Sequence, residues 1–176
     1  MKNFSLTDLS EYSKYLISRY RNVGVLLDTN VLLLLLVGYY DPNYIEQVKR
    51  IRKFTKDDYF LLAWLVKLFP KLVVTPQILA EISNFLDLSK KLSKEQFLIF
   101  IQLFIEKIRD TKEIYKEKND MVIHNLLPTL GFTDVSISML AEKKRCLVIT
   151  ADGPLAQRIR EKGSDVINFE EIRIKL

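Results

Sequence analysis

Two acidic residues stand at the ends of short segments rich in Val, Leu and Ile. Asp28 directly follows residues 23–27, and Asp152 follows residues 147–149 after two intervening residues. Each segment is a predicted strand that is buried on both faces. Ligands of an open parallel sheet gather beyond the carboxyl ends of its strands. We therefore expect both carboxylates to lie at one rim of a sheet.

Two further acids are expected at the same rim. Glu81 lies about one and a half turns into the helix that follows a third predicted strand, residues 72–74. Asp134 begins the helix that leads into the strand at 147–149. Four carboxylates at close range repel one another. They stay ionised only if a cation binds, and otherwise some of them must take up protons.

A set of oxygen ligands alone suits a hard divalent cation, Mg²⁺ or Mn²⁺. Such an ion lowers the pKa of a bound water, orients that water and stabilises the leaving oxygen of a phosphodiester. The only cysteine, Cys146, lies in an apolar run and is expected to be buried. A cysteine-based zinc site is thereby excluded. The only histidine, His124, is outside these segments, and we expect it to have a structural or surface role.

Each acid also has a purely structural interpretation. Asp28 and Asp152 precede residues that are typical of a helix start, so both suit the N-cap position. Asp134 suits a first helical turn, where a negative charge is favoured. Glu81 could simply be solvated. The coincidence of all four acids at one predicted rim favours a functional site over four separate structural roles.

The elements that must position these acids alternate between strand and helix. Strands are predicted at residues 23–27, 72–74, 147–149 and 166–167. Helices are predicted at residues 5–20, 31–37, 42 through the basic stretch to 56, 57–69, 77–86, 93–115, 134–144 and 152–162. Buried strands that alternate with helices predict a parallel sheet. The expected fold is a helix-rich α/β protein, a three-layer α/β/α sandwich with a short parallel sheet.

The composition is that of one domain with a real core. The chain has 176 residues, of which 48% are hydrophobic. A net charge of +5 is compatible with a polyanionic partner. The apolar stretch around Asp28 is too short and too polar for a bilayer-spanning helix, which needs roughly 20 apolar residues. We expect no membrane association, and a single cysteine fits a reducing, cytoplasmic setting.

The acids lie in four segments that resemble the motifs of PIN domains, in the order of that family. The segments are residues 25–32 (VLLDTNVL), 74–82 (VTPQILAEI), 131–137 (GFTDVSI) and 147–152 (LVITAD), the last followed by Leu155. Residues 163–169 resemble the last strand of the family. The resemblance covers roughly residues 23–169, and the first and last motifs are the more specific ones.

The resemblance implies a PIN-like nuclease that cleaves RNA with Mg²⁺ or Mn²⁺. It implies that Asp28, Asp134 and Asp152 bind the metal and that Glu81 assists, directly or through water. Two supporting polar residues near the metal would be Asn30 and Thr150. The whole chain, residues 1–176, would form a single PIN-like domain with an N-terminal helix within 1–22 and a helical insertion at 39–70.

Many small members of the family, the VapC-like ribonucleases, are toxins of type II toxin–antitoxin pairs. The resemblance therefore implies RNA, a cognate antitoxin and a second copy of the chain as candidate partners. The insertion and the N-terminal helix make this chain longer than the most compact toxins. Two other interpretations remain open. One is a non-catalytic PIN-like scaffold that binds RNA or protein, and the other is a DNA-directed or structure-specific nuclease.

The insertion is rich in cations that could contact the phosphates of RNA. Lys49, Arg52 and Lys53 are the candidates, and Arg50 and Lys56 belong to the same basic stretch. The alternative interpretation is a solvated helix face, which is the commoner role of such a charge run.

Overall fold

Short runs of buried aliphatic residues form one five-stranded sheet in the computed structural model, which describes residues 4–83 and 92–174. The strands are β1 (Val25–Leu27), β2 (Leu72–Val74), β3 (Lys112–Glu113), β4 (Leu147–Thr150) and β5 (Val166–Asn168). All neighbouring strands pair in parallel, in the order β3-β2-β1-β4-β5. Every residue of β1 and β4 is buried, as expected for strands with helices on both faces.

The strand order places the first strand at the centre of the sheet. From β1 the chain moves outward through β2 to β3, and it then returns to the other side of β1 to form β4 and β5. The direction of winding therefore reverses between β1 and β4. In parallel sheets, ligands bind outside the carboxyl ends of the strands at such a switch point. Asp28 and Asp152 follow the two strands that border it.

The helices begin mostly at Ser, Thr, Asp or Asn caps. They are α1 (Glu11–Tyr20), α2 (Thr29–Tyr40), α3 (Lys56–Val66), α4 (Pro76–Ile82), α6 (Lys94–Arg109), α7 (Lys118–Val122), α8 (Leu127–Glu142), α9 (Gly153–Glu161) and α10 (Phe169–Arg173), with 3₁₀ helices η1 (Leu6–Asp8) and η2 (Pro42–Gln47). Capping boxes precede η1, α3 and α6, at Ser5, Thr55 and Ser93.

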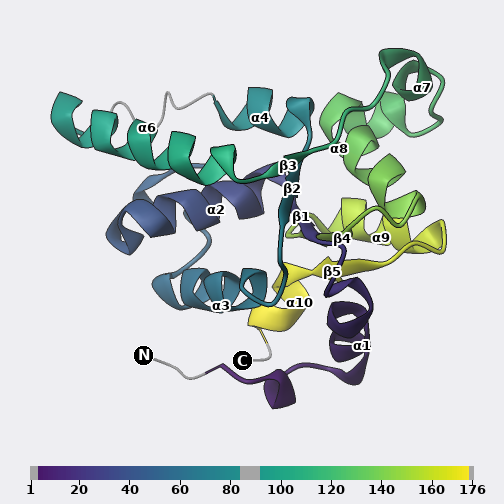
Figure 1. The fold of residues 1–176 in the computed structure, drawn as a ribbon, viewed down its shortest axis with the longest axis horizontal. Helices are drawn as coiled ribbons and strands as arrows, with labels where there is room; N and C mark the ends of the chain where they lie inside the picture. Colours follow the sequence, from purple (N-terminus) through teal and green to yellow (C-terminus); the bar gives the residue numbers. More distant parts are fainter. Residues whose placement is uncertain (1–3, 84–91, 175–176) are drawn as a thin grey trace.

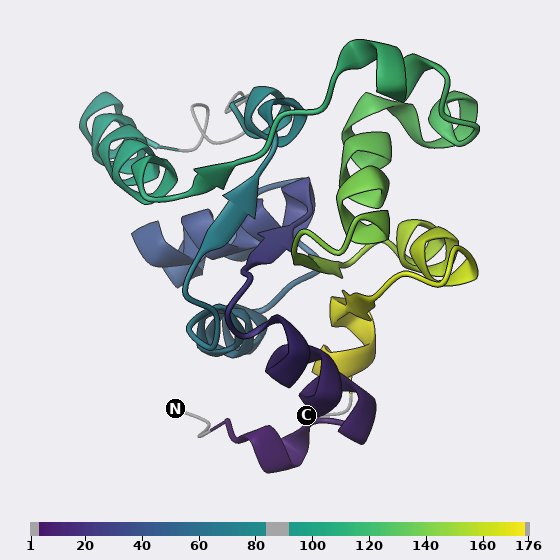
Figure 2. The same cartoon turned by 45° about the vertical axis from the view of Figure 1, so that its right-hand side comes forward.

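Helices cover both faces of the sheet. Figure 1 shows α2, α3 and α6 on one side of the strands and α1, α8 and α9 on the other. The same division is visible after a 45° turn (Figure 2). The helix-rich three-layer α/β/α sandwich with a short parallel sheet is therefore confirmed. In the described part of the chain, no helix is long and apolar enough to cross a membrane.

The predicted strands are confirmed, with small differences at their ends. β2 has the predicted bounds, and β4 and β5 each extend one residue further. β1 begins at Val25 rather than at residue 23, because Gly24 has a φ of 122°. β3 was not predicted. The helix expected to reach residue 115 ends at Arg109, and two exposed polar residues then pair with the edge of β2.

The helix predicted at residues 31–37 continues through Gly38, contrary to the prediction. α2 continues to Tyr40. A Cβ atom built on Gly38 would lie 2.1 Å from a ring carbon of Tyr59 on α3. The glycine is needed because the two helices approach closely at this point, and its backbone remains helical.

Three other helix predictions need correction. The first helix is divided into η1 and α1, because Ser10 has an extended backbone and caps α1. The basic stretch after Asp41 does not form a long helix, since η2 ends at Gln47 and turns follow. The helix expected at 57–69 starts at Lys56 and ends at Val66. The helix predicted at 77–86 is α4, which starts at Pro76 and ends at Ile82, while residues 84–86 lie outside the described residues.

Candidate active site

Asp28 is a buried carboxylate at the carboxyl end of the central strand, with a side chain fixed by three donors. It caps α2 by accepting the backbone N–H of Val31 at 2.8 Å through Oδ1. Its Oδ2 accepts the N–H of Ala151 at 2.9 Å and the hydroxyl of Thr150. Burial raises the pKa of Asp28, while these hydrogen bonds oppose the rise and the charge of Asp152 adds to it. The cap predicted as the structural interpretation is therefore real.

Thr150 connects the two acids that border the switch point. Its buried hydroxyl donates to Asp28 and accepts the backbone N–H of Asp152 at 2.9 Å. Asp152 is exposed, and its Oδ1 caps α9 by accepting the N–H of Leu155 at 2.8 Å. The predicted supporting residue thus lies between two predicted metal ligands.

Glu81 extends from α4 toward the start of α2. Its Oε2 accepts the hydroxyl of Thr29 at 2.9 Å, and its Oε1 pairs with the guanidinium of Arg50. Local sequence patterns did not identify either partner, because the pairs join residues that are 52 and 31 positions apart. The only signal for Thr29 was its place beside Asp28 in a first helical turn.

Asp134 is positioned by a break in α8. Gly131 has φ 76° and ψ 176°, so the helix stops there and a new helical segment begins. Asp134 lies in the first turn of this second segment, close to the predicted helix start. Burial raises the pKa of Asp134 to about 7, and the charges of Asp152, Asp28 and Glu81 add to the rise.

These four residues are called the acidic rim below. They come from the ends of two strands and from two helices, and each of the other three acids contributes to the raised pKa of Asp134. The other three acids are therefore near enough for their charges to act on Asp134. Within residues 4–83 and 92–174, however, no three Asp, Glu, His or Cys side chains form a group that could hold a metal ion.

The hydrogen bonds and the ion pair of the acidic rim explain why its carboxylates do not form such a group. Both oxygens of Asp28 accept protein hydrogen bonds, and Asp152 is turned toward the start of α9. Glu81 is paired with a cation of the protein itself. The donor set fits Mg²⁺ or Mn²⁺ in its chemistry, because it offers carboxylate oxygens alone. In position it is not preformed, and the expected ligands Asp28, Asp134 and Asp152 stay a prediction.

The remaining predicted residues have different surroundings. Asn30 is partly buried in the first turn of α2, and its side chain makes no hydrogen bond within the described segments. Lys49, Arg52 and Lys53 are exposed in the turns after η2. Lys53 pairs with Glu170 at 2.6 Å, and its Nζ lies 3.5 Å from the carbonyl oxygen of Ala151.

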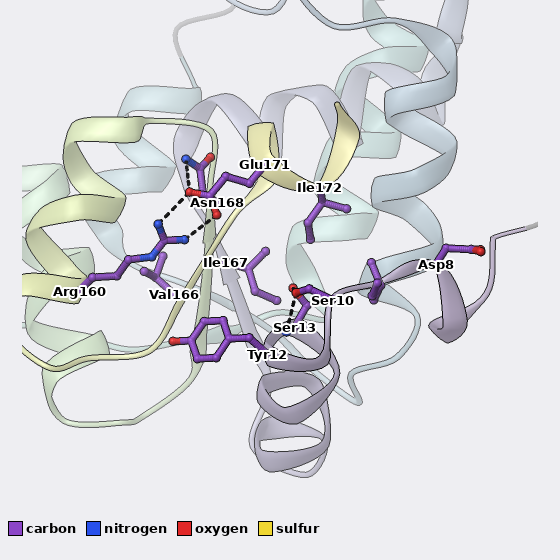
Figure 3. Close-up of a pocket in the computed structure, with 11 residues that line it drawn as sticks. Asp8, Ser10, Tyr12, Ser13, Arg160, Val166, Ile167, Asn168, Glu171 and Ile172 are labelled. Atoms are coloured by element: carbon purple, nitrogen blue, oxygen red, sulfur yellow. Dashed lines mark hydrogen bonds and ion pairs between the residues drawn. The ribbon is translucent and has the colours of Figure 1, made fainter. Parts of the chain in front are cut away.

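A small cavity of about 50 Å³ lies elsewhere, between the start of α1, β5 and α10 (Figure 3). Its polar wall includes Arg160, whose two terminal nitrogens each donate to Glu171 at 2.8 Å. Ser10 and Ser13 are hydrogen-bonded to each other on the opposite wall. None of the four acids lines this cavity, so it is separate from the acidic rim.

The chain was compared with protein-family models, curated proteins and solved structures. No family model matches, and neither does any curated protein or solved structure. A functional proposal therefore has to start from the residues of the acidic rim.

Proposed function

We propose that this chain is a metal-dependent endoribonuclease that hydrolyses RNA phosphodiester bonds at the acidic rim. The observation that carries the proposal is the proximity of four acids from separate parts of the chain: burial raises the pKa of Asp134 to about 7, and the charges of the other three acids add to the rise. A structural protein gains nothing from such repulsion, whereas perturbed pKa values are common at functional sites. The resemblance to PIN domains supports RNA as the substrate.

Each residue of the rim has a part in this proposal. A bound Mg²⁺ or Mn²⁺ would supply an activated water and stabilise the leaving oxygen. Asp28, Asp134 and Asp152 would hold the ion, and their side chains would have to turn from the positions described above. Thr150 keeps Asp28 oriented through its hydroxyl. Glu81 would take part directly or through a water.

The exposed cations beside the rim support a polyanionic substrate. Lys49, Arg50, Arg52 and Lys53 follow one another in the turns after η2, and the chain carries a net charge of +5. Non-specific contacts from such residues hold a phosphate backbone. A cognate antitoxin and a homodimer, as found for VapC-like toxins, belong to the same proposal.

A second candidate is a non-catalytic PIN-like scaffold that binds RNA or protein. Two observations favour it: no three-ligand group is preformed in the described residues, and Arg50 already neutralises Glu81. Binding of Mn²⁺ separates the two candidates. Absence of binding at millimolar Mn²⁺, in a folded protein, supports the scaffold.

The nuclease proposal is tested with single-stranded RNA, transfer RNA and DNA of matching sequence, each incubated with Mg²⁺, Mn²⁺ or EDTA. Asp152→Asn is the main variant, because Asn can still accept the N–H of Leu155 and keep the helix cap. We expect cleavage to fall by at least about a hundredfold. DNA cleaved as fast as RNA supports the structure-specific or DNA-directed alternative.

Asp41→Asn is the matched control. Asp41 also caps a helix, η2, by accepting the N–H of Asn43 at 2.9 Å, but it is not part of the acidic rim. Its substitution should leave cleavage unchanged. Wild-type rates in Asp152→Asn, or an equal loss in Asp41→Asn, would contradict the proposed role of the rim.

A further inference from the structure

The segment 48–54 is a turn-rich loop anchored by three buried side chains, called the cationic loop below. Val48, Ile51 and Phe54 recur at every third position and are almost completely buried. The N–H of Ile51 donates to the carbonyl of Val48, and the N–H of Phe54 donates to that of Ile51, at 3.0 and 2.9 Å. The residues between the three anchors are the exposed Lys49, Arg50, Arg52 and Lys53. The three buried anchors therefore determine where these cations lie on the surface.

The cationic loop contacts the acidic rim on two sides. Arg50 pairs with Glu81 on α4, whose other oxygen accepts the hydroxyl of Thr29. Lys53 lies 3.5 Å from the carbonyl oxygen of Ala151, and the N–H of the same Ala151 donates to Asp28. The cationic loop thus places Arg50 and Lys53 next to the acidic rim, and Lys53 is also paired with Glu170 at 2.6 Å.

The pair between Arg50 and Glu81 is suited to exchange. The side chains are 34% and 38% exposed, so water competes with their attraction. Exposed ion pairs contribute about 0–1 kcal/mol, and their partners can be replaced at small cost. A guanidinium binds phosphate with a planar pair of donors, as it binds a carboxylate.

We propose that Arg50 is a substrate-binding residue: Glu81 holds its guanidinium over the acidic rim in the free protein, and the guanidinium moves to a phosphate of the bound RNA strand. This inference rests on the proposed function, since it takes RNA as the ligand. Glu81 then also has a role before any metal binds, because its carboxylate holds the guanidinium of Arg50 in place until the RNA binds.

The test measures binding of a labelled single-stranded RNA by fluorescence anisotropy in EDTA, where the metal reaction is stopped. Arg50→Ala should weaken binding roughly tenfold, because one charged hydrogen-bonded contact is lost. The slope of log affinity against log salt should fall by about 0.7. Glu81→Gln should do the opposite and tighten binding, because it releases Arg50. A purely structural ion pair predicts the same direction for both variants.

Two further variants distinguish Arg50 from the neighbouring cations and from the charge of Glu81. Arg52→Ala deletes a cation from the same loop, and Arg52 makes no ion pair within the described parts of the chain, so we expect a smaller loss than for Arg50→Ala. In the double variant, Glu81→Gln should no longer tighten binding, because the released cation is absent. Persistent tightening there would mean that Glu81 acts only by repelling RNA.

The inference is overturned if both single variants shift affinity in the same direction, if Arg52→Ala weakens binding as much as Arg50→Ala, or if the tightening survives in the double variant. In each case, RNA cleavage by the wild type would leave the proposed function standing. A wild type that neither binds nor cleaves RNA would overturn both.

Discussion

The acidic rim and a second polar cluster differ in the balance of their positive and negative charges. The second cluster, called the balanced cluster, consists of His124, Glu142 and Lys162. Glu142 Oε1 accepts from Lys162 Nζ at 2.7 Å and lies 3.5 Å from Nε2 of His124. Nδ1 of His124 accepts the backbone N–H of Leu126 at 3.3 Å. These contacts support the structural role predicted for His124.

The pKa shifts of the two regions have opposite signs. In the balanced cluster, burial raises the pKa of Glu142, but the hydrogen bonds and charges of Lys162 and His124 outweigh it, so the net shift is downward. In the acidic rim, burial and like charges act together and raise the pKa of Asp134 to about 7. The balance of charge, rather than the number of titratable groups, separates a structural cluster from a candidate site.

The largest effect is expected from divalent cations. Mn²⁺ at about one hundred times its dissociation constant should stabilise the wild type by about 2.7 kcal/mol, because it binds only the folded acidic rim. The shift is measured as a rise in melting temperature during a Mn²⁺ titration. Asp152→Asn should lose most of it, and Glu142→Gln should keep it. Equal loss of the stabilisation in both variants would show that Mn²⁺ does not bind specifically at the acidic rim.

The next effect concerns Asp134 in the metal-free protein. Its pKa rises from 3.8 to about 7 on folding, so the folded state holds a proton that the unfolded state releases. Stability is therefore lost as pH rises from about 4 to 7. Asp134→Asn should stabilise the protein by about 1–2 kcal/mol at pH 8, after allowance for partial exposure. Denaturant unfolding in EDTA at pH 4 and pH 8 checks this. A benefit that is as large at pH 4 would show that ionisation of Asp134 is not its cause.

The smallest effect is expected in the balanced cluster, with the opposite sign. The pKa of Glu142 is depressed, so its stabilisation is complete above the ordinary value of 4.5 and is lost as pH falls through the folded value. Glu142→Gln should cost at most about 1 kcal/mol at pH 7, because the pair with Lys162 is partly exposed. The same unfolding series should show the difference disappearing at low pH. A stabilising Glu142→Gln at pH 7 would contradict the charge balance.

The parts of the fold that the sequence predicted are those in which local pattern and burial coincide. β2 has its predicted bounds because three apolar residues stand between Lys71 and the cap at Thr75. Asp28 and Asp152 were located because each directly or closely follows an apolar strand. These features depend only on neighbouring residues.

The parts that were missed depend on contacts between distant residues. β3 consists of Lys112 and Glu113, which become a strand only by pairing with the edge of β2. Gly38 directly follows the predicted helix 31–37, yet it lies inside α2 at the contact with Tyr59 on α3. The pair of Arg50 with Glu81 joins residues 31 positions apart, which no local spacing reveals.

The anchors of the cationic loop have a consequence for any attempt to shorten the chain. Ile45, Val48, Ile51 and Phe54 are all almost completely buried, and the ring of Phe54 packs against that of Phe169 at the start of α10. The segment between α2 and α3 is thus part of the hydrophobic interior. Deleting this segment would leave a void beside α10 and remove the cations together with the buried residues that hold them in place.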